Sequence, residues 1–378
     1  MAASQGRVDR LASQRRVHPA RLPRLRAAAQ LLHRPASARR PAEIARAIAG
    51  AQAQDVFAGP LTFRSRSRRL TARDIERART EERSLLRTWL MRKTMHLIPT
   101  DDAGWMLPLF EPMIERWCRM RLEQLGVPAA AQEKALRTVA RALEREGPLT
   151  RPEANERVAA AGIELNTQTR MHIALLSVVS GVACLGPDRG SRTCLVRRED
   201  WIGKQERVER EAALGELARR YLRAFGPATD RDFAYWSGLG LREMRAGLEA
   251  IAGELKELRV GDETMLSLRG RRPRLPAVGQ VRMLANFDTY LLGWKDRRFS
   301  VPDEHAAAVK EGGGGWIRPV VVRDGIVIGG WRSARKGGRI EISLNLPPSK
   351  RSELREALDA EIQDVERFEG MPVKLASA

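Results

Sequence analysis

The sequence predicts an α+β protein that is mainly helical, with three tandem winged helix-turn-helix motifs followed by a small C-terminal β/α module. Three observations predict this fold. The order helix, helix, hairpin occurs first within residues 21–105. The same order recurs behind two Gly-Pro-x-Thr patterns, which begin at Gly147 and Gly226. From residue 276 onward the pattern changes to strands around an Asp-Gly turn.

These observations divide the 378 residues into several modules, as the length of the chain favours. The expected parts are a basic N-terminal arm (1–20), winged helix 1 (21–105), winged helix 2 (106–202), winged helix 3 (203–275) and a β-rich C-terminal module with a closing helix (276–378). The arginine-rich composition of the arm is typical of a disordered segment.

The first winged helix begins with two short helices. Apolar spacing from Leu22 predicts the first of them, which Pro35 closes. Ser37 precedes the second, which ends at Gly50. The chain therefore leaves a helix immediately before the segment Gln52-Ala53-Gln54, whose two amides have no obvious packing role.

Arginines alternate with other residues shortly after that segment, in the run Arg64-Ser65-Arg66-Ser67-Arg68-Arg69. Alternate residues of an extended chain share a face. The run therefore predicts an exposed edge of arginines, and we expect Arg64 and Arg66 to bind DNA there. A helix over about 71–79 follows.

Residues 86–99 are rich in β-forming residues and predict a tight hairpin with its turn near Arg92 and Lys93. At a turn, both cations are placed to bind DNA phosphates, and the alternative is a solvated turn. His96, also in the hairpin, is expected either to contact a phosphate or a base or to be structural, and both alternatives stay open.

The second and third winged helices each begin with a capping box. Thr150 is followed three residues later by Glu153, and Thr229 by Asp232. Behind them we expect helices and strand pairs at 151–161, 167–179, 183–185 with 193–196, 241–251, and 257–260 with 264–268.

In the C-terminal module, Asp324-Gly325 is the preferred two-residue hairpin turn between two strands. A strand over 339–344 and a helix over 350–368 follow. The pattern fits a small α+β or barrel-like cap.

The formal net charge of +20 and the pI near 11.0 imply a polyanionic partner. Most of the cations are arginine, which suits phosphates and base edges, so nucleic acid is the first expectation. The alternative is an arginine-rich proteome that inflates the charge of every surface.

Composition also bounds the cofactors and the compartment. The three cysteines form no CxxC or Cys/His cluster, so we expect no metal, no cofactor and a reduced, cytoplasmic protein. The longest apolar run, 172–186, is too short to span a bilayer, so no membrane partner is expected. Without a heptad repeat we expect a monomer with no obligate protein partner.

Three stretches resemble the AlkZ-like winged-helix DNA glycosylases, a bacterial family. Gln52-Ala53-Gln54 resembles the family's Gln-apolar-Gln catalytic motif, and residues 87–97 resemble its Arg-Thr-Trp-x-Met-Arg-Gly-Thr-x-His stretch. Residues 287–293 with Asp324-Gly325 are similar to its C-terminal module. One departure is Lys93, which stands where the family usually has glycine.

The resemblance implies tandem winged helices around duplex DNA and removal of N7-alkylated purines, including those in interstrand crosslinks. The chemistry is consistent with two amides. An N7-alkylated purine is already cationic and needs no general acid, so an amide that orients water can suffice. We therefore expect Gln54 to hold the attacking water and Gln52 to support the water or the sugar.

Two alternatives remain at this stage. Asp55 is the rival of the glutamines, because a carboxylate is the stronger base, unless it is a loop or cap residue. A non-catalytic winged-helix transcriptional regulator is the other functional class, since winged helices are mainly binding modules.

Overall fold

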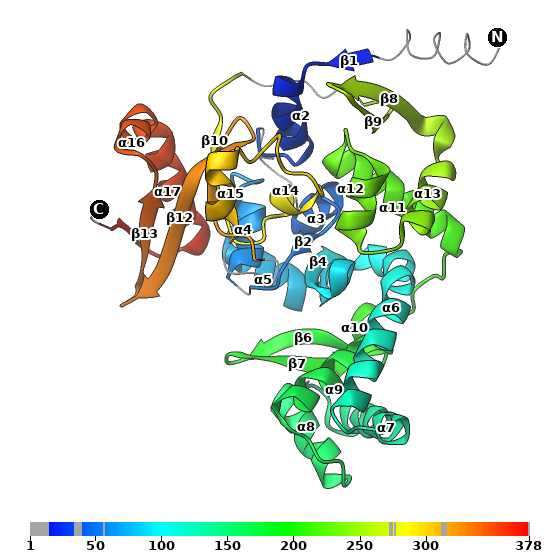
Figure 1. Ribbon diagram of the computed structural model, residues 1–378. Coiled ribbons are helices and arrows are strands. Elements are labelled where there is room, and N and C mark those ends of the chain that lie inside the picture. Colours follow the sequence, from blue (N-terminus) through cyan, green and yellow to red (C-terminus); the bar gives the residue numbers. More distant parts are fainter. Residues whose placement is uncertain are drawn as a thin grey trace, which may run out of the picture. The chain divides into compact units, whose positions relative to one another are not determined.

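The computed structural model of the protein describes residues 15–33, 40–55, 57–271, 275, 277–310 and 316–376. It has an α+β fold, as the sequence predicts (Figure 1). The chain forms two compact units, of which unit 1 comprises 1–72 and 214–378, and unit 2 comprises 73–213. Within the described ranges, every helix is too short or too polar to cross a membrane.

Unit 2 combines long helices with a mainly antiparallel sheet. Its helices are α5 (Ala72–Thr80), which starts at the junction, η2 (Met91–Lys93), η3 (Thr100–Asp102), α6 (Ala103–Gln124), α7 (Ala129–Glu146), α8 (Arg151–Ala160), α9 (Thr167–Val179) and α10 (Arg198–Ile202). Its strands are β3 (Leu85–Trp89), β4 (Met95–Pro99), β5 (Leu149–Thr150), β6 (Ala183–Arg189) and β7 (Arg192–Arg197). They follow the order β4-β3-β6-β7-β5.

Local sequence signals explain the ends of these elements. The capping box of α8 is confirmed, because Thr150 Oγ1 accepts from the N–H of Glu153 at 3.4 Å and Glu153 accepts from the N–H of Thr150 at 2.7 Å. The predicted hairpin is also confirmed, with Arg87 opposite Leu97. Helix α9 packs on α6, and all of its residues from Ile173 to Val179 are buried.

Unit 1 is assembled from both ends of the chain. Its helices are η1 (Pro19–Arg21), α2 (Leu22–Ala29), α3 (Pro41–Ala47), α4 (Ala58–Arg64), most of α11 (Arg210–Phe225), α12 (Asp230–Ser237), α13 (Leu241–Glu249), η4 (Ala252–Glu254), α14 (Thr289–Leu292), α15 (Asp303–Val309), α16 (Pro348–Glu353) and α17 (Arg355–Glu369). Its strands are β1 (Arg15–Val17), β2 (Ala51–Gln52), β8 (Leu255–Val260), β9 (Glu263–Leu268), β10 (Val281–Leu284), β11 (Val320–Arg323), β12 (Ile326–Lys336), β13 (Arg339–Asn345) and β14 (Val373–Leu375).

The N-terminal part of unit 1 begins earlier than expected. Strand β1 pairs in parallel with β8, with Val17 opposite Val260, so the last residues of the predicted disordered arm are ordered. Residues 1–14, Pro35 and Ser37 lie outside the described residues. The two predicted helices of this region are present as α2 and α3.

Helices α12 and α13 precede the hairpin β8–β9, as predicted. The capping box is confirmed here too, because Asp232 donates its N–H to Thr229 Oγ1 at 3.1 Å. Gly238 ends α12 with a left-handed φ of 75°, which glycine adopts without steric cost. Behind these helices, stacked aromatic rings fill the core, among them Tyr221, Phe233 and Trp236.

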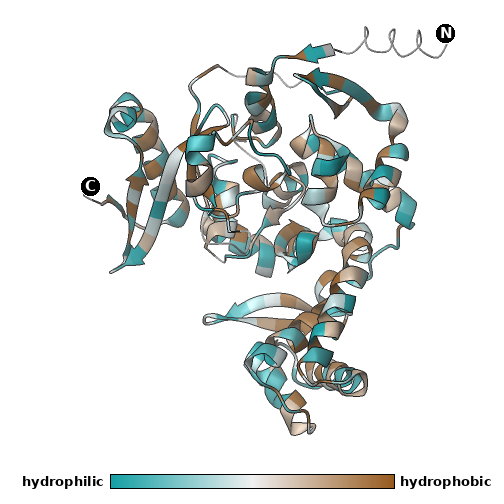
Figure 2. Cartoon of the chain, viewed as in Figure 1, coloured by the Kyte–Doolittle hydropathy of each residue, from teal (hydrophilic) through white to brown (hydrophobic). Residues whose placement is uncertain are grey.

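The C-terminal module is an open sheet in the order β10-β11-β12-β13-β14, so the α+β alternative describes it better than a barrel. Asp324 and Gly325 form its predicted turn with φ of 53° and 83°. A Cβ on Gly325 would lie 2.5 Å from the carbonyl oxygen of Pro23. Helix α17 packs against β10 and buries Val365, while the far end of β12 and β13 is hydrophilic (Figures 1 and 2).

Candidate active site

The segment that carries the two glutamines leaves its helix as the sequence predicts. Helix α3 ends at Ala47, and Gly50 has a φ of 94° and donates its N–H to the carbonyl of Ala45 at 2.8 Å. The chain then becomes extended in β2. Gln52 is buried, with 4% of its surface exposed, whereas Gln54 is exposed. The two amides therefore differ in their access to solvent.

Small residues let α4 approach this segment closely. Gly59 in α4 faces Ala53, the residue between the glutamines, and a Cβ on Gly59 would lie 3.0 Å from the Ala53 Cβ. A larger residue at either position would push the segment away from the helix. Close packing against α4 therefore fixes the position of the glutamine segment.

Asp55 anchors the start of α4. Its Oδ1 accepts from the N–H groups of Phe57 at 2.8 Å and Ala58 at 3.1 Å, and its Oδ2 accepts from Asn286 Nδ2 at 3.2 Å. Both oxygens thus bind groups that hold the turn, which is the behaviour of a helix cap. The geometry favours the cap alternative for Asp55 over a role as general base.

The expected exposed edge of arginines is wrong for Arg64 and Arg66. Arg64 lies at the end of α4 and is 1% exposed, with its Nη1 3.0 Å from Glu361 Oε2 and 3.1 Å from Asp364 Oδ2. It also donates to the carbonyl of Met283. Arg64 is the last residue of a helix and Ser65 and Arg66 form a turn, where the alternation suggested an extended edge.

Arg66 is 0% exposed and makes a bidentate pair with Asp288, at 2.8 Å for each of its Nη atoms. Gln30 Oε1 accepts a further hydrogen bond from Nη2 at 3.1 Å. Arg64 and Arg66 are therefore closed off from a DNA phosphate and link α4 to the C-terminal module. In the same run, Arg68 and Arg69 are the exposed arginines.

The turn of the β3–β4 hairpin is conformationally strained. Arg92 and Lys93 have φ of 53° and 61°, in the left-handed region where residues with a Cβ are disfavoured. This conformation explains why glycine is usual at the second position in the family that the sequence resembles. Lys93 is exposed, and its Nζ lies 5.0 Å from the ring centroid of Trp117.

His96 is buried within the hairpin. It is 2% exposed, and its Nδ1 lies 2.9 Å from the carbonyl oxygen of Thr94. Burial, reinforced by the charge of Arg92, lowers the pKa of the ring to about 3. The structure thus supports the structural alternative for His96 over a contact with phosphate.

Buried histidines make stability fall in mild acid. Burial also lowers the pKa of His33 to about 4, so the unfolded chain takes up protons on both rings below its own pKa of about 6.5. Their contribution is complete above that pH and is lost as the pH falls toward the folded values, at about 1.4 kcal/mol per pH unit per ring. Urea unfolding at pH 6 and pH 5 should show this loss, and His96→Gln should remove about half of it. An unchanged pH dependence in His96→Gln would contradict this assignment.

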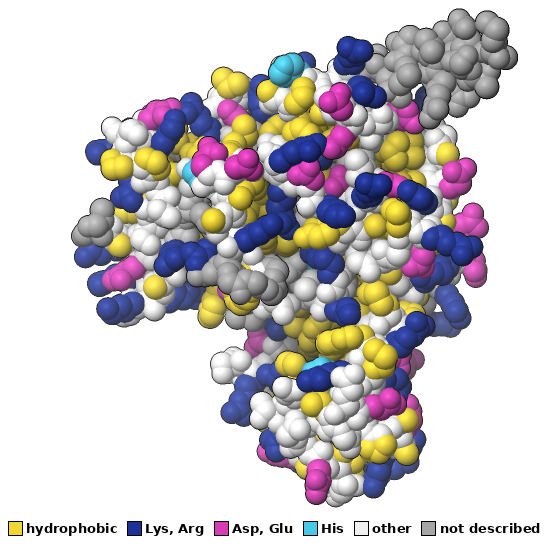
Figure 3. Space-filling view, in the orientation of Figure 1, with side chains coloured by type: hydrophobic (Ala, Val, Ile, Leu, Met, Phe, Trp, Pro, Cys, Tyr) yellow, Lys and Arg dark blue, Asp and Glu magenta, His cyan; other side chains and the backbone are white. Residues whose placement is uncertain are grey.

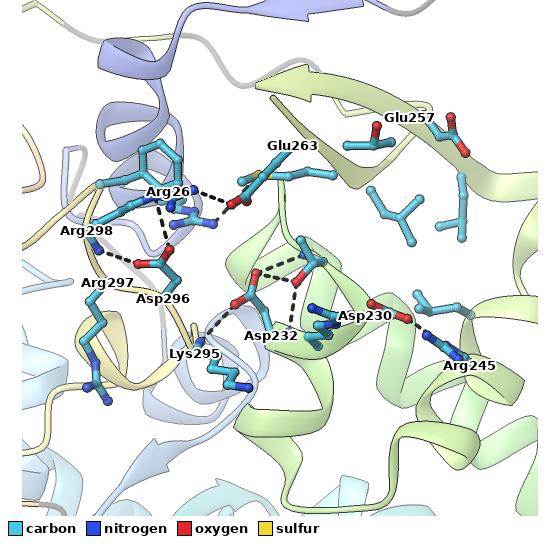
Figure 4. Close-up of a pocket in the computed structure, with 18 of the residues that line it drawn as sticks. Arg26, Asp230, Asp232, Arg245, Glu257, Glu263, Lys295, Asp296, Arg297 and Arg298 are labelled. Carbon is cyan, nitrogen blue, oxygen red and sulfur yellow. Dashed lines mark hydrogen bonds and ion pairs between the residues drawn. The ribbon is translucent and has the colours of Figure 1, made fainter. Parts of the chain in front are cut away.

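A hollow of about 1360 Å³ lies elsewhere in unit 1, between α12, α13, the β8–β9 hairpin and the loop before α15 (Figure 4). Its charges largely neutralise one another. Arg298 pairs with Glu263 and Asp296, and Arg245 pairs with Asp230 at 2.7 Å. Neither Gln52 nor Gln54 lines it, so this hollow is separate from the glutamine segment.

Basic side chains are distributed over the face shown in Figure 3, with acidic residues between them. In the part of the chain described, no group of three or more His, Cys, Asp or Glu side chains is arranged to hold a metal ion. The two amides of the candidate site can each donate a hydrogen bond to a water and accept one from it.

The predicted site residues fall into two groups. Gln52, Gln54 and the buried arginines belong to unit 1, whereas Arg92, Lys93 and His96 belong to unit 2. The sequence did not single out Asn286 or Phe57, which adjoin the glutamine segment through Asp55. Asn286 immediately precedes the quoted stretch 287–293, and this adjacency was the available signal.

Comparisons with known proteins agree with the resemblance. The family model described as DNA glycosylase AlkZ-like matches residues 44–368. The interstrand DNA cross-link repair glycosylase of Streptomyces sahachiroi is 32% identical over 267 residues, covering 66% of this chain and 70% of that protein. The solved structure of Streptomyces sahachiroi DNA glycosylase AlkZ matches with a TM-score of 0.74 and 25% identity, over 96% of this chain and 100% of that one.

Proposed function

The chain belongs to the AlkZ-like DNA glycosylase family, and we propose that it releases cationic N7-alkylated purines from duplex DNA, including purines joined in interstrand crosslinks. As a member of this family it is a DNA glycosylase, an enzyme that hydrolyses N-glycosidic bonds. The observation that carries the proposal is Gln52-Ala53-Gln54 on an extended segment held by α4, with one amide exposed and the other buried.

The proposed reaction needs only a positioned water. The water oxygen bonds to C1′ of the sugar, and the C1′–N9 bond breaks. The electrons of that bond neutralise the positive charge of the purine, and the proton that the water loses passes to bulk solvent. Gln54, which is exposed, orients the water, while the buried Gln52 supports it or the sugar. Because an amide is a poor base, this site suits a purine that is already cationic.

DNA binding is assigned to both units. The second and third winged helices are supported by the order helix, helix, hairpin in α8–α9–β6–β7 and in α12–α13–β8–β9. We propose the boundaries 21–105, 106–202 and 203–275 for the three winged helices. Arg92 and Lys93 at the hairpin turn bind phosphates. We propose that the protein acts as a monomer at the nucleoid, in DNA repair or in resistance to a genotoxin.

A transcriptional regulator is disfavoured, because the family match gives this chain a catalytic relative across most of its length. One simple test distinguishes a glycosylase from a transcriptional regulator. Methylated plasmid incubated with the enzyme and then treated with alkali breaks at abasic sites if a base has been released. Sequence-selective binding without breaks would support the regulator.

The direct test uses two duplexes of one sequence, one with a single 7-methylguanine and one with a crosslink through two guanine N7 atoms. We expect the enzyme to release 7-methylguanine from the first duplex, which chromatography detects. We expect it to convert the crosslinked duplex to single strands, which a denaturing gel detects. A matched duplex without damage is the control. The proposal fails if neither lesion is processed under single-turnover conditions.

Replacing the strained lysine should separate stability from DNA binding. Lys93→Gly should raise the free energy of unfolding by about 1 kcal/mol, because glycine adopts the left-handed φ at no steric cost. It should also weaken DNA binding and reduce the slope of log K against log salt by roughly 1, the effect of one phosphate contact.

Lys93→Ala is the matched control, since it loses the charge but keeps a Cβ at this φ. It should weaken DNA binding as much as Lys93→Gly without the gain in stability. Urea unfolding and fluorescence anisotropy at several salt concentrations measure the two effects. Unchanged binding by both variants would show that Lys93 is a solvated turn residue.

A further inference from the structure

Two aromatic side chains are exposed, whereas the other aromatic rings of the protein are buried or half-buried. The sequence contains 8 Phe, 3 Tyr and 8 Trp. Among the residues described, Phe57 is 56% exposed and Trp316 is 53% exposed, while the remaining rings are buried or half-buried. Exposing a large ring forfeits the free energy of burying it, so exposure of these two rings calls for a reason.

Both rings belong to unit 1 and are connected to the glutamine segment through a series of contacts. Phe57 lies three residues after Gln54, and its N–H is held by Asp55 Oδ1 at 2.8 Å. Asp55 Oδ2 binds Asn286 at 3.2 Å. The next residue, Phe287, packs its ring 5.0 Å from the ring of Trp316. The Asp55–Asn286 hydrogen bond therefore joins the segment that carries Phe57 to the residue before Phe287, whose ring packs against Trp316.

Each ring is held on one side. The guanidinium of Arg335, on β12, lies 4.5 Å from the ring centroid of Phe57 and is itself paired with Glu369. Trp316 packs at an interplanar angle of 46° against Phe287, which is 6% exposed and whose N–H binds the carbonyl of Ile317 at 3.2 Å. Rings supported in this way lose little conformational entropy when a planar ligand stacks on them.

We propose that Phe57 and Trp316 stack on the unstacked bases at the lesion and so hold the alkylated purine against Gln54. The inference rests on the proposed function and adds the residues that would position its substrate. A crosslinked purine is tied to the opposite strand and cannot swing fully into a deep pocket. A site for it must therefore hold the opened bases from outside, and aromatic faces do this without regard to sequence.

The test uses the full-length enzyme and a duplex in which 2-aminopurine flanks a single 7-methylguanine. Binding of the native enzyme should raise 2-aminopurine fluorescence as that base leaves its stack. Phe57→Ala and Trp316→Ala should each lower the fluorescence change and the single-turnover release rate by roughly tenfold, the value of stacking on about one base. Affinity for undamaged duplex should change much less.

Conservative variants and a distant control separate stacking from damage to the fold. Phe57→Tyr and Trp316→Phe keep an aromatic face and should restore most of both signals. Met120→Ala removes a side chain of similar exposure, 51%, from unit 2 and should behave as the native protein. Thermal melting of every variant checks that the fold is retained.

The outcomes distinguish the two proposals. If the native enzyme releases no base but the fluorescence change depends on the two rings, the proposed function fails and stacking stands. If the Phe57→Ala/Trp316→Ala double variant, folded, keeps the native fluorescence change and release rate, the stacking proposal is overturned. Aromatic replacements that behave like the alanine variants would overturn it as well.

Discussion

Gln54→Ala is expected to lower the single-turnover rate of 7-methylguanine release by about 100-fold or more, the usual cost of losing one preorganised polar group at a reacting centre. In the proposed reaction the exposed amide of Gln54 orients the attacking water, and alanine would leave that water free to rotate. Because Gln54 is on the surface, the free energy of unfolding should change by less than about 0.5 kcal/mol. Chromatography of the released base and urea unfolding measure the two quantities.

Gln124→Ala is the matched control for this variant. Gln124 is also exposed, ends α6 in unit 2 and accepts a hydrogen bond from Arg121, so its loss should leave base release unchanged. Gln52→Ala should slow release too, but with some loss of stability, because Gln52 is buried. A Gln54→Ala enzyme that releases the base at the native rate would remove the amide from the mechanism.

The largest effect on stability is expected at the buried ion pair of Arg66 and Asp288. Arg66→Met leaves a carboxylate that is 0% exposed without its bidentate partner, and removing one member of a buried pair costs about 3–5 kcal/mol. The free energy of urea unfolding should fall by that amount. The glutamine segment is linked to the same module through Asn286, so activity should become temperature-sensitive as well.

Two comparisons isolate the charge effect. Arg66→Met combined with Asp288→Leu removes both charges and should recover much of the lost stability, because no isolated charge stays buried. Arg68→Ala, at an exposed arginine of the same run, should change stability by less than about 0.5 kcal/mol. If Arg66→Met is as stable as Arg68→Ala, the pair does not hold the module as we describe.

Features encoded by neighbouring residues could be predicted from the sequence. The capping boxes at Thr150 and Thr229 and the turn at Asp324-Gly325 depend on atoms within a few positions, and all three are present. The exit from the helix before Gly50 is of the same kind. In each case the backbone geometry follows from the residue types alone.

Features that depend on distant partners could not be predicted. Arg66 and Asp288 are 222 residues apart in the sequence, and Arg64 and Glu361 are 297 apart. The residues near the arginines in the sequence therefore do not indicate these carboxylate partners. Without them, an alternation of arginine and serine is most simply explained as a solvated edge. The cap formed by Asp55 was open for the same reason, since Asn286 is 231 residues away.

The candidate site divides along the same line. The identity of the two glutamines could be recognised as a motif, whereas their different exposure depends on how unit 1 packs around them. Likewise, the strain at Lys93 follows from the turn that the sequence predicts, but the burial of His96 depends on the surrounding core. The family matches confirm the enzyme class, and the roles of single residues stay as proposals.

Unit 1 joins residues 1–72 to residues 214–378, and this order of assembly has a consequence for synthesis on the ribosome. When the glutamine segment emerges, the distant partners of Arg64, Arg66 and Asp55, which are Glu361, Asp288 and Asn286, have not yet been translated. Unit 2 is one continuous stretch of chain, 73–213, and can therefore fold before unit 1 is complete. The candidate site is therefore completed only after residue 361 has been synthesised, so shorter nascent chains would carry the motif without its distant partners.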